Sequence, residues 1–171
     1  MRFLLLSFLL PVTAMAMGGS KQGPAHAKLE APTMKDLKAS VQMQETDKGI
    51  KVTADVSGLK PGAVHGFHVH EKGECKGPDF KSAGPHFNPG NHSHSGPAAQ
   101  SKHLGDLGNL VANDKGIAKT EVLIPKAKEH GLESFIGKAV IIHAKADDLT
   151  TQPAGDSGDR IACGLIRAGS I

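Results

Sequence analysis

Short runs in which apolar and polar residues alternate are the main pattern of this sequence, and they favour strands over helices. Residues 37–43 and 50–56 alternate in this way and flank the turn signal Asp47-Lys48-Gly49. Residues 57–62, with two glycines and a proline, end the second run, and residues 63–70 form a third. Because successive side chains of a strand point to opposite faces, these runs predict half-buried strands.

Further strands are predicted after a long stretch without periodicity. Residues 71–109 are rich in Gly, Pro, Asn, Ser and His and predict a loop, as do residues 145–158. Strands are expected at 109–112, 117–123, 138–144 and 159–166, and one helical turn at 126–132. Seven or eight short strands separated by turn signals predict an all-β fold, an antiparallel sandwich or barrel.

The first 16 residues have the features of a secretory signal peptide. Arg2 supplies a positive charge, residues 3–10 are almost entirely apolar, and Ala14-Met15-Ala16 matches a small-residue cleavage site. The apolar run is too short to span a bilayer, so we expect export without a membrane anchor. Residues 17–35 show no periodicity and predict a flexible segment, which leaves residues 36–171 as one domain.

Composition limits the classes of partner and suggests a covalent link. The 171 residues carry a formal net charge of +3 and include neither Trp nor Tyr, which argues against nucleic-acid binding. The chain has two cysteines, Cys75 and Cys163. In an exported chain this pair favours a disulfide. Two free thiols, or thiol ligands to a metal, are the alternatives.

The candidate chemistry lies in seven side chains that can bind metal ions. They are His68, His70, His86, His94, His103, Asp106 and His143. His68 and His70 lie two residues apart on a predicted strand, so both point to one face and can bind one ion. Imidazole suits copper and zinc. Seven ligands exceed the needs of one site, so two adjacent sites are the simplest interpretation.

The seven residues divide into two sets that share one histidine. His86, His94, His103 and Asp106 would make a closed set of three nitrogens and one oxygen, which is typical of structural zinc. The other set is His68, His70, His143 and a shared His86, whose four nitrogens suit Cu(II).

Four further histidines are weighed against these ligands. His92 competes with His94 for the closed site, and nothing in the residues themselves excludes it. His65 shares its parity with the core-facing Phe67 and Val69, so we expect it to be a hydrogen-bonded core residue. His26 and His130 are expected on the surface.

With these residues in place, the sequence closely resembles the copper/zinc superoxide dismutase family. The resemblance runs from about Leu37 to Ile166 and rests on the segments HGFHVHE, GPHFNP, HLGDLGN and GDRIACGLI. It implies a Greek-key β-sandwich and an enzyme that converts superoxide to oxygen and hydrogen peroxide, with one copper and one zinc per subunit. It assigns the copper site to His68, His70, His86 and His143, and the zinc site to His86, His94, His103 and Asp106. Family spacing selects His94 over His92.

The resemblance also gives roles to residues around the metals. Asp147 would accept hydrogen bonds from His68 and His94, one ligand of each site, and so fix the orientation of both rings. Arg160 would orient the superoxide anion with a fixed positive charge. His86 would bridge the two metals and carry a proton during the reaction.

Two departures from the animal enzymes are informative. Cys75 follows His70 by only five residues, which resembles the bacterial periplasmic branch, so we expect a periplasmic protein. The loop from Asp147 to Arg160 is short and contains no lysine, although in animal enzymes this loop supplies charge that attracts superoxide. The lysines that we expect to do part of this work here are Lys72, Lys76 and Lys81. The alternative is that they are only solvated.

Two other classes of function stay open. A periplasmic copper and zinc storage protein or chaperone would need the ligands but no substrate-orienting Arg160. A zinc-free variant of the enzyme would not need His94, His103 and Asp106. A homodimer is expected from the family, but its branches use different faces and the sequence assigns none.

Overall fold

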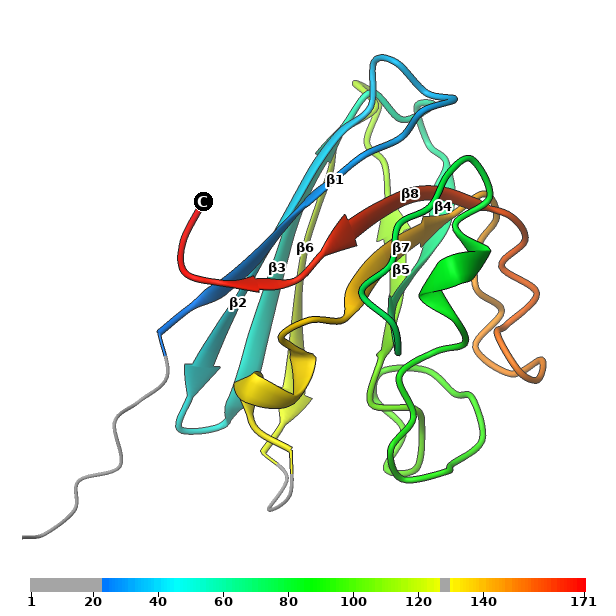
Figure 1. The fold of residues 1–171 in the computed structure, drawn as a ribbon. Coiled ribbons are helices and arrows are strands. Elements are labelled where there is room, and N and C mark those ends of the chain that lie inside the picture. Colours follow the sequence, from blue (N-terminus) through cyan, green and yellow to red (C-terminus); the bar gives the residue numbers. More distant parts are fainter. Residues whose placement is uncertain (1–22, 127–129) are drawn as a thin grey trace, which may run out of the picture.

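Two antiparallel β-sheets form the fold, as the alternating pattern predicts. The computed structural model describes residues 23–126 and 130–171. One sheet has five strands in the order β6-β3-β2-β1-β9, and the other has four in the order β5-β4-β7-β8. The chain changes sheet between β3 and β4, β5 and β6, β6 and β7, and β8 and β9, as expected for a Greek-key sandwich (Figure 1).

The strands are short and two 3₁₀ turns accompany them. The elements are β1 (Ala25–Leu29), β2 (Lys38–Thr46), β3 (Gly49–Ser57), β4 (Val64–His70), η1 (Lys81–Ala83), β5 (Asp106–Val111), β6 (Ala118–Pro125), η2 (Leu132–Phe135), β7 (Ala139–His143), β8 (Arg160–Leu165) and β9 (Arg167–Ala168). No helix in the described part of the chain is long and apolar enough to cross a membrane.

The prediction of a flexible segment at residues 17–35 is wrong for residues 25–29. Residues 25–29 form β1, which pairs with β2 and β9 in an antiparallel register. Its buried positions are Ala25, Ala27 and Leu29, and two alanines give a weak apolar signal that a sequence pattern does not separate from a polar linker. Residues 17–22 and the predicted signal peptide at 1–16 lie outside the described residues.

Two other predicted boundaries shift. The strand expected at 109–112 begins at Asp106, because the pairing of β5 with β4 extends to His68 across a register shift. Asp106 is therefore a strand residue and not part of the loop. The helical turn expected at 126–132 lies at Leu132–Phe135, and residues 127–129 are outside the described part.

The core fills the space between the sheets with side chains from alternate positions. On β2 the buried apolar residues are Ala39, Val41 and Met43, and β3 contributes Val52, Ala54 and Val56. The side chains between them face solvent, which is the alternation seen in the sequence. One edge of the sandwich is closed by two main-chain hydrogen bonds between Glu30 and Cys163, with N···O distances of 2.8 and 3.0 Å.

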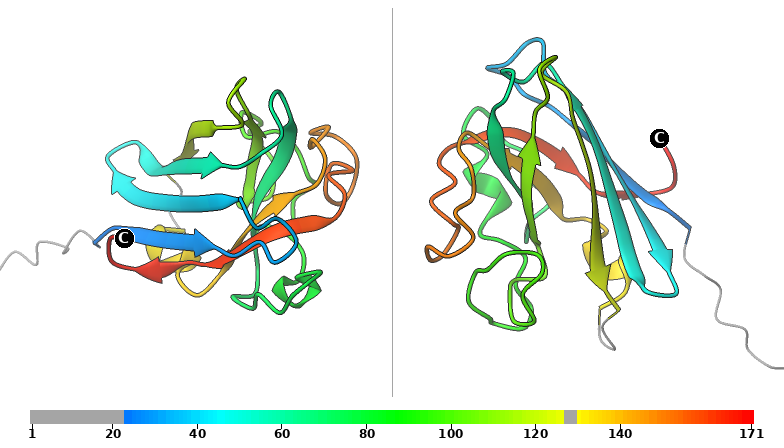
Figure 2. Two further views of the ribbon diagram at one scale, coloured as in Figure 1. Left: turned by 90° about the horizontal axis from the view of Figure 1, so that it is seen from above. Right: turned by 180° about the vertical axis from the view of Figure 1, so that it is seen from behind.

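Strand β4 differs because both of its faces are covered. Phe67 and Val69 point into the core, whereas His68 and His70 lie on the opposite face and are equally buried. The long loop after β4 and the loop between β7 and β8 lie together beside the four-stranded sheet, away from the five-stranded one (Figures 1 and 2). These two loops cover the histidine face and create the environment of the site.

Candidate metal centre

The long loop is fixed to β4 by its main chain. The Phe87 N–H donates to Val69 O at 2.8 Å, the Val69 N–H to Gly105 O at 2.9 Å, and the Gly105 N–H to Phe87 O at 2.9 Å. A side chain at residue 105 would place its Cβ only 2.2 Å from Val69 O, so this approach requires glycine. The loop therefore returns to the strand at both ends, which brings its histidines over His68 and His70.

Four donor atoms converge at the first of two clusters. The Asp106 Oδ1 atom lies 2.9 Å from His86 Nδ1, 3.1 Å from His94 Nδ1 and 3.2 Å from His103 Nδ1. The Nδ1 atoms of His86 and His103 are 3.4 Å apart. Four ligands about 2.0–2.1 Å from a central zinc ion are separated by about 3.3 Å at tetrahedral geometry. The measured separations match this, so the cluster fits a tetrahedral ion.

Asp106 is held as a carboxylate in this cluster. Burial by itself raises its pKa, but hydrogen bonds from the His86 ring and the Ser95 N–H outweigh burial and hold the pKa of Asp106 well below its ordinary value. The second oxygen, Oδ2, accepts the N–H groups of His103 at 3.0 Å and Ser95 at 3.2 Å. Oδ2 is thus occupied by main-chain donors of the loop, whereas Oδ1 faces the three histidine Nδ1 atoms and can bind a cation together with them.

The second cluster consists of four imidazole nitrogens without partners. His68 Nδ1, His70 Nε2, His86 Nε2 and His143 Nε2 are buried and make no hydrogen bond, and each of the four residues offers one ligand atom that lies within 4.8 Å of the others. Buried polar atoms normally have partners, because an unpaired one costs free energy. A metal ion at their centre satisfies all four nitrogens, so these residues fit a four-nitrogen copper site.

The opposite nitrogens of three of these rings are occupied, which fixes the ring orientations. His68 Nε2 contacts Asp147 Oδ2 at 2.8 Å, His70 Nδ1 contacts Gly84 O at 2.7 Å, and His143 Nδ1 contacts Gly158 O at 3.1 Å. Each acceptor requires a proton on the contacting nitrogen, so the other nitrogen presents its lone pair to the cluster. His86 differs, because its Nδ1 belongs to the first cluster and its Nε2 to the second.

Burial keeps these ligands neutral. Desolvation lowers the pKa of His68 and of His70 well below the ordinary histidine value, and it lowers the pKa of His143 to about 4. A metal ion binds the unprotonated imidazole nitrogen. At neutral pH these three rings are therefore ready to bind a metal without first losing a proton.

Asp147 links the two clusters, as predicted. Its Oδ2 accepts from His68 at 2.8 Å and its Oδ1 accepts from His94 Nε2 at 2.9 Å, and all three side chains are fully buried. The main chain of Asp147 is held by the amide of Asn109, which donates to Asp147 O at 2.9 Å and accepts from its N–H at 2.8 Å. The position of this carboxylate is therefore set by β5.

Two amide side chains that support the site, Asn109 and Gln152, were not predicted from the sequence. The Gln152 amide makes a similar pair of hydrogen bonds to the main chain of His94, at 2.8 Å from the His94 N–H and 2.9 Å to its carbonyl. Gln152 lies 58 residues from His94, and no local pattern marks such a contact. For Asn109 the sequence offers one signal, which is its position three residues after the candidate ligand Asp106 on the same strand.

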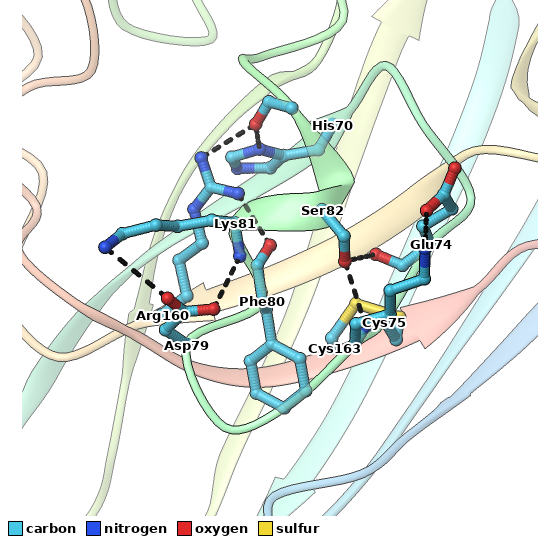
Figure 3. Close-up of a disulfide and its surroundings, with 11 residues drawn as sticks. His70, Glu74, Cys75, Asp79, Phe80, Lys81, Ser82, Arg160 and Cys163 are labelled. Carbon is cyan, nitrogen blue, oxygen red and sulfur yellow. Dashed lines mark hydrogen bonds and ion pairs between the residues drawn. A yellow bond between two sulfur atoms is a disulfide. The ribbon is translucent and has the colours of Figure 1, made fainter.

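Arg160 lies beside the second cluster. Its two terminal nitrogens donate to Phe80 O at 2.8 Å and to Gly84 O at 2.7 Å, and Gly84 O also accepts from His70 (Figure 3). An open cavity of about 1080 Å³ is lined by His70, His86, His143 and Arg160. We call it the site cavity. It places a fixed positive charge next to the ligands of the four-nitrogen cluster, in a space accessible to a small anion.

The predicted disulfide is present. Cys75 and Cys163 are bonded across a sequence separation of 88 residues, which excludes the alternatives of free thiols and of thiol ligands for these two residues. The bond joins the loop after β4 to strand β8, whose first residue is Arg160 (Figure 3).

The competing histidines lie outside both clusters. His92 Nδ1 contacts the Ser101 hydroxyl and is exposed, and His94 occupies the place for which His92 competed. His65 is buried and its Nδ1 contacts His143 O at 2.7 Å, so it is a hydrogen-bonded interior residue as predicted. His26 and His130 belong to neither cluster.

Comparisons with known proteins agree with this geometry. The family model described as copper/zinc superoxide dismutase matches residues 37–166. A protein of Aquifex aeolicus named superoxide dismutase [Cu-Zn] 2 is 40% identical over 148 residues, which cover 84% of this chain and 86% of that protein. Superoxide dismutase [Cu-Zn] of Paramecium bursaria Chlorella virus 1 is 36% identical over 170 residues, with 96% and 88% covered. Among solved structures, the clock protein EA4 matches with a TM-score of 0.76 and 33% identity, over 91% of this chain and all of that one.

Proposed function

Because the chain belongs to the copper/zinc superoxide dismutase family, we propose that its two clusters divide the metals between them. Copper is held by His68, His70, His86 and His143, and zinc is held by His86, His94, His103 and Asp106. The observation that carries this assignment is the shared residue His86, whose two ring nitrogens face different clusters. Three imidazoles with a carboxylate suit zinc, and four imidazoles suit Cu(II).

The protein is an enzyme that disproportionates superoxide to oxygen and hydrogen peroxide. Copper supplies the one-electron redox chemistry when bound, and zinc does not change its redox state. Of two superoxide anions, one gives up an electron and leaves as oxygen, and the other gains that electron and two protons.

We assign two of the chain's residues to this reaction. Arg160 presents a guanidinium to the site cavity, and its hydrogen-bond partners are neutral carbonyls, which do not cancel its positive charge. His86 is one of the residues that line the cavity, so a proton carried on its Nε2 when that atom is not bound to copper can be passed to the reduced substrate. The Nδ1 atom of the same ring stays fixed beside Asp106, which keeps the imidazole in place while the proton moves.

Of the three lysines expected to attract superoxide, two are paired with carboxylates. Lys76 pairs with Glu74 at 2.9 Å and Lys81 pairs with Asp79 at 3.4 Å, so much of their field is cancelled at a distance. Lys72 lines the site cavity together with Arg160. We therefore propose that Lys72 contributes most of the attraction among the three.

The attraction is tested by the salt dependence of the rate. The variant Lys72→Gln should consume superoxide more slowly than the wild type, and its rate should depend less on ionic strength. Lys115→Gln is the matched control, because Lys115 lies in the turn before β6 and does not line the cavity. Equal rates and equal salt dependence in both variants would rule Lys72 out.

The metal assignment and the reaction are tested together. Elemental analysis of the reconstituted protein should give about one copper and one zinc per chain, and the loaded protein should consume superoxide rapidly. His86→Ala should lose both activity and the coupling between the sites, whereas His92→Ala should behave as the wild type. A wild-type protein that binds both metals but consumes no superoxide would instead be a storage protein or chaperone.

We also propose that the protein is exported to the periplasm after removal of residues 1–16. The supporting observations are the charge and apolar run at the N-terminus, and a disulfide of the kind that persists in oxidising compartments. Mass spectrometry of the protein from a periplasmic extract should give a chain that starts near Met17. A cytoplasmic protein that retains Met1 would contradict the proposal.

The homodimer remains a prediction without an assigned face. The exposed side chains Val111 and Leu123 lie on β5 and β6, strands at the edges of their sheets. Sedimentation analysis of the metal-loaded protein gives the assembly state directly, and a monomer at all concentrations would refute the prediction.

A further inference from the structure

The direction of the Arg160 side chain is set by two carbonyl groups of one loop segment. Phe80 O and Gly84 O each accept one terminal nitrogen of Arg160. The two carbonyls lie on either side of the turn η1. Carbonyl groups orient a guanidinium without neutralising its charge. The orientation of the Arg160 guanidinium therefore depends on the rigidity of residues 80–84.

Phe80 has a main-chain conformation that a bulky residue rarely adopts. Its φ and ψ angles of 52° and 21° lie in the left-handed region, which is unfavourable for a residue with a large side chain. In this conformation the Phe80 carbonyl accepts both the Ala83 N–H at 3.1 Å and Arg160 at 2.8 Å. Because the backbone itself disfavours this conformation, tertiary contacts of residue 80 must stabilise it.

The buried aromatic ring of Phe80 stabilises this conformation. The Phe80 side chain is only 1% exposed and packs in a small apolar cluster that is separate from the main core. The other members of the cluster are Ala83, Ala139, Ile141, Cys163 and the half-buried Cys75. Figure 3 shows that the ring and the carbonyl of Phe80 point in opposite directions, the ring away from Arg160 and the carbonyl toward it.

The covalent anchor of the loop lies five residues away, at Cys75. Between the disulfide and η1 the main chain makes one turn, in which the Phe80 N–H donates to Lys76 O at 3.2 Å. The Asp79 and Lys81 side chains on either side of Phe80 are largely exposed. The buried ring is thus the apolar contact that fixes this stretch of the loop at the point where it meets Arg160.

We propose that Phe80 is a positioning residue for the reaction: its buried ring holds the left-handed turn whose carbonyl aims Arg160 into the site cavity. This inference rests on the proposed role of Arg160 in orienting superoxide. It predicts that removal of the ring leaves both metals bound but lets the guanidinium leave its place. A structural residue of the main core has no such selective effect.

The test compares three variants of the copper- and zinc-loaded protein. Phe80→Ala removes the ring, and Phe80→Leu keeps an apolar side chain that still fills the cluster. Met43→Ala is the matched control, since it truncates an equally buried side chain of the five-stranded sheet. Metal content is measured by elemental analysis, superoxide consumption is measured per bound copper, and affinity for azide, a small anion like superoxide, is measured from the visible spectrum of copper.

We expect Phe80→Ala to lose about tenfold in rate and to bind azide more weakly, since an ångström of misplacement can cost roughly a hundredfold. Phe80→Leu should recover most of both, and Met43→Ala should change neither quantity per bound copper. Wild-type rate and azide affinity in Phe80→Ala would overturn the inference.

A double-mutant cycle with Arg160→Ala separates this role from damage to the copper site. If Phe80 acts through Arg160, then Phe80→Ala should have no further effect on azide affinity once Arg160 is absent. Additive losses would show that Phe80 acts on the metal site itself and would refute the positioning role. If the loaded wild type consumes no superoxide, the proposed function fails first, whatever Phe80 does.

Discussion

The sharpest prediction concerns the carboxylate that links the two metal sites. In the proposed holoprotein both His68 and His94 bind their metals through Nδ1, so both carry a proton on Nε2 and both donate to Asp147. Asp147→Asn keeps the shape of the side chain but offers one acceptor oxygen and one NH₂ group. One histidine keeps its partner, and the other faces a donor instead of an acceptor.

The magnitude follows from the geometry of this site. The lost hydrogen bond is short, 2.8 or 2.9 Å, and lies among side chains with no exposed surface. A hydrogen bond to a charged group contributes about 1.5–3 kcal/mol, which corresponds to roughly a ten- to hundredfold change in an equilibrium constant. This range agrees with the roughly 10–100-fold loss of metal affinity that follows loss of a ligand's hydrogen-bond partner in other proteins. We therefore expect at least about a tenfold loss at one of the two sites.

Competition with chelators measures the effect for copper and zinc separately. Asp156→Asn is the control, because it removes the same charge from the same loop, and Asp156 contacts only Lys145, at 4.0 Å, among the ion pairs described. The control should retain both metals with wild-type affinity. If Asp147→Asn also retains both with wild-type affinity, the argument that this carboxylate fixes the two rings is wrong.

Three further predictions concern stability and zinc retention. The double variant C75A/C163A loses a link that closes 88 residues, so its unfolding free energy in urea should fall by about 4–5 kcal/mol; an unchanged midpoint would contradict this. In the metal-stripped protein burial holds the pKa of His143 at about 4, below about 6.5 in the unfolded chain. The unfolded chain then binds more protons than the folded one between these values, so stability should rise with pH across this window and be lost as pH falls through it. Equal urea midpoints at pH 7 and pH 5 would exclude that linkage. Gln152→Ala removes two hydrogen bonds to the main chain of His94, each worth about 0.5–1.5 kcal/mol, and should release zinc to a chelator faster than the control Gln100→Ala. Identical release from both would show that the clamp does not contribute.

The candidate ligands were predictable from the sequence because their chemistry and spacing are local properties, but the choice of His94 over His92 came only from the family resemblance. A pair two residues apart on a strand must share a face, so His68 and His70 could be assigned together once β4 was recognised. The strand itself follows from alternation, since Phe67 and Val69 need the core. The pairing of Cys75 with Cys163 needed only a count of cysteines.

Strand β1 and the choice of metal-facing nitrogen at each histidine depend on tertiary contacts that are not visible in the sequence. Strand β1 forms because β2 and β9 offer edges to pair with, and its alanines show little pattern without those partners. The choice between Nδ1 and Nε2 at each histidine depends on acceptors such as Gly84 O and Gly158 O, which lie 14 and 15 residues away in the chain.

The sequence by itself thus determined which side chains can bind the metals and that short antiparallel strands would carry them. The tertiary structure decided the orientation of those side chains, because the groups that fix each orientation come from distant segments of the chain. Gln152 reaches His94 across 58 residues, Asn109 reaches Asp147 across 38, and Phe80 reaches Arg160 across 80. Alternation and spacing report on a residue's near neighbours in the chain, whereas hydrogen bonds of this kind exist only after the two sheets and both loops have packed together.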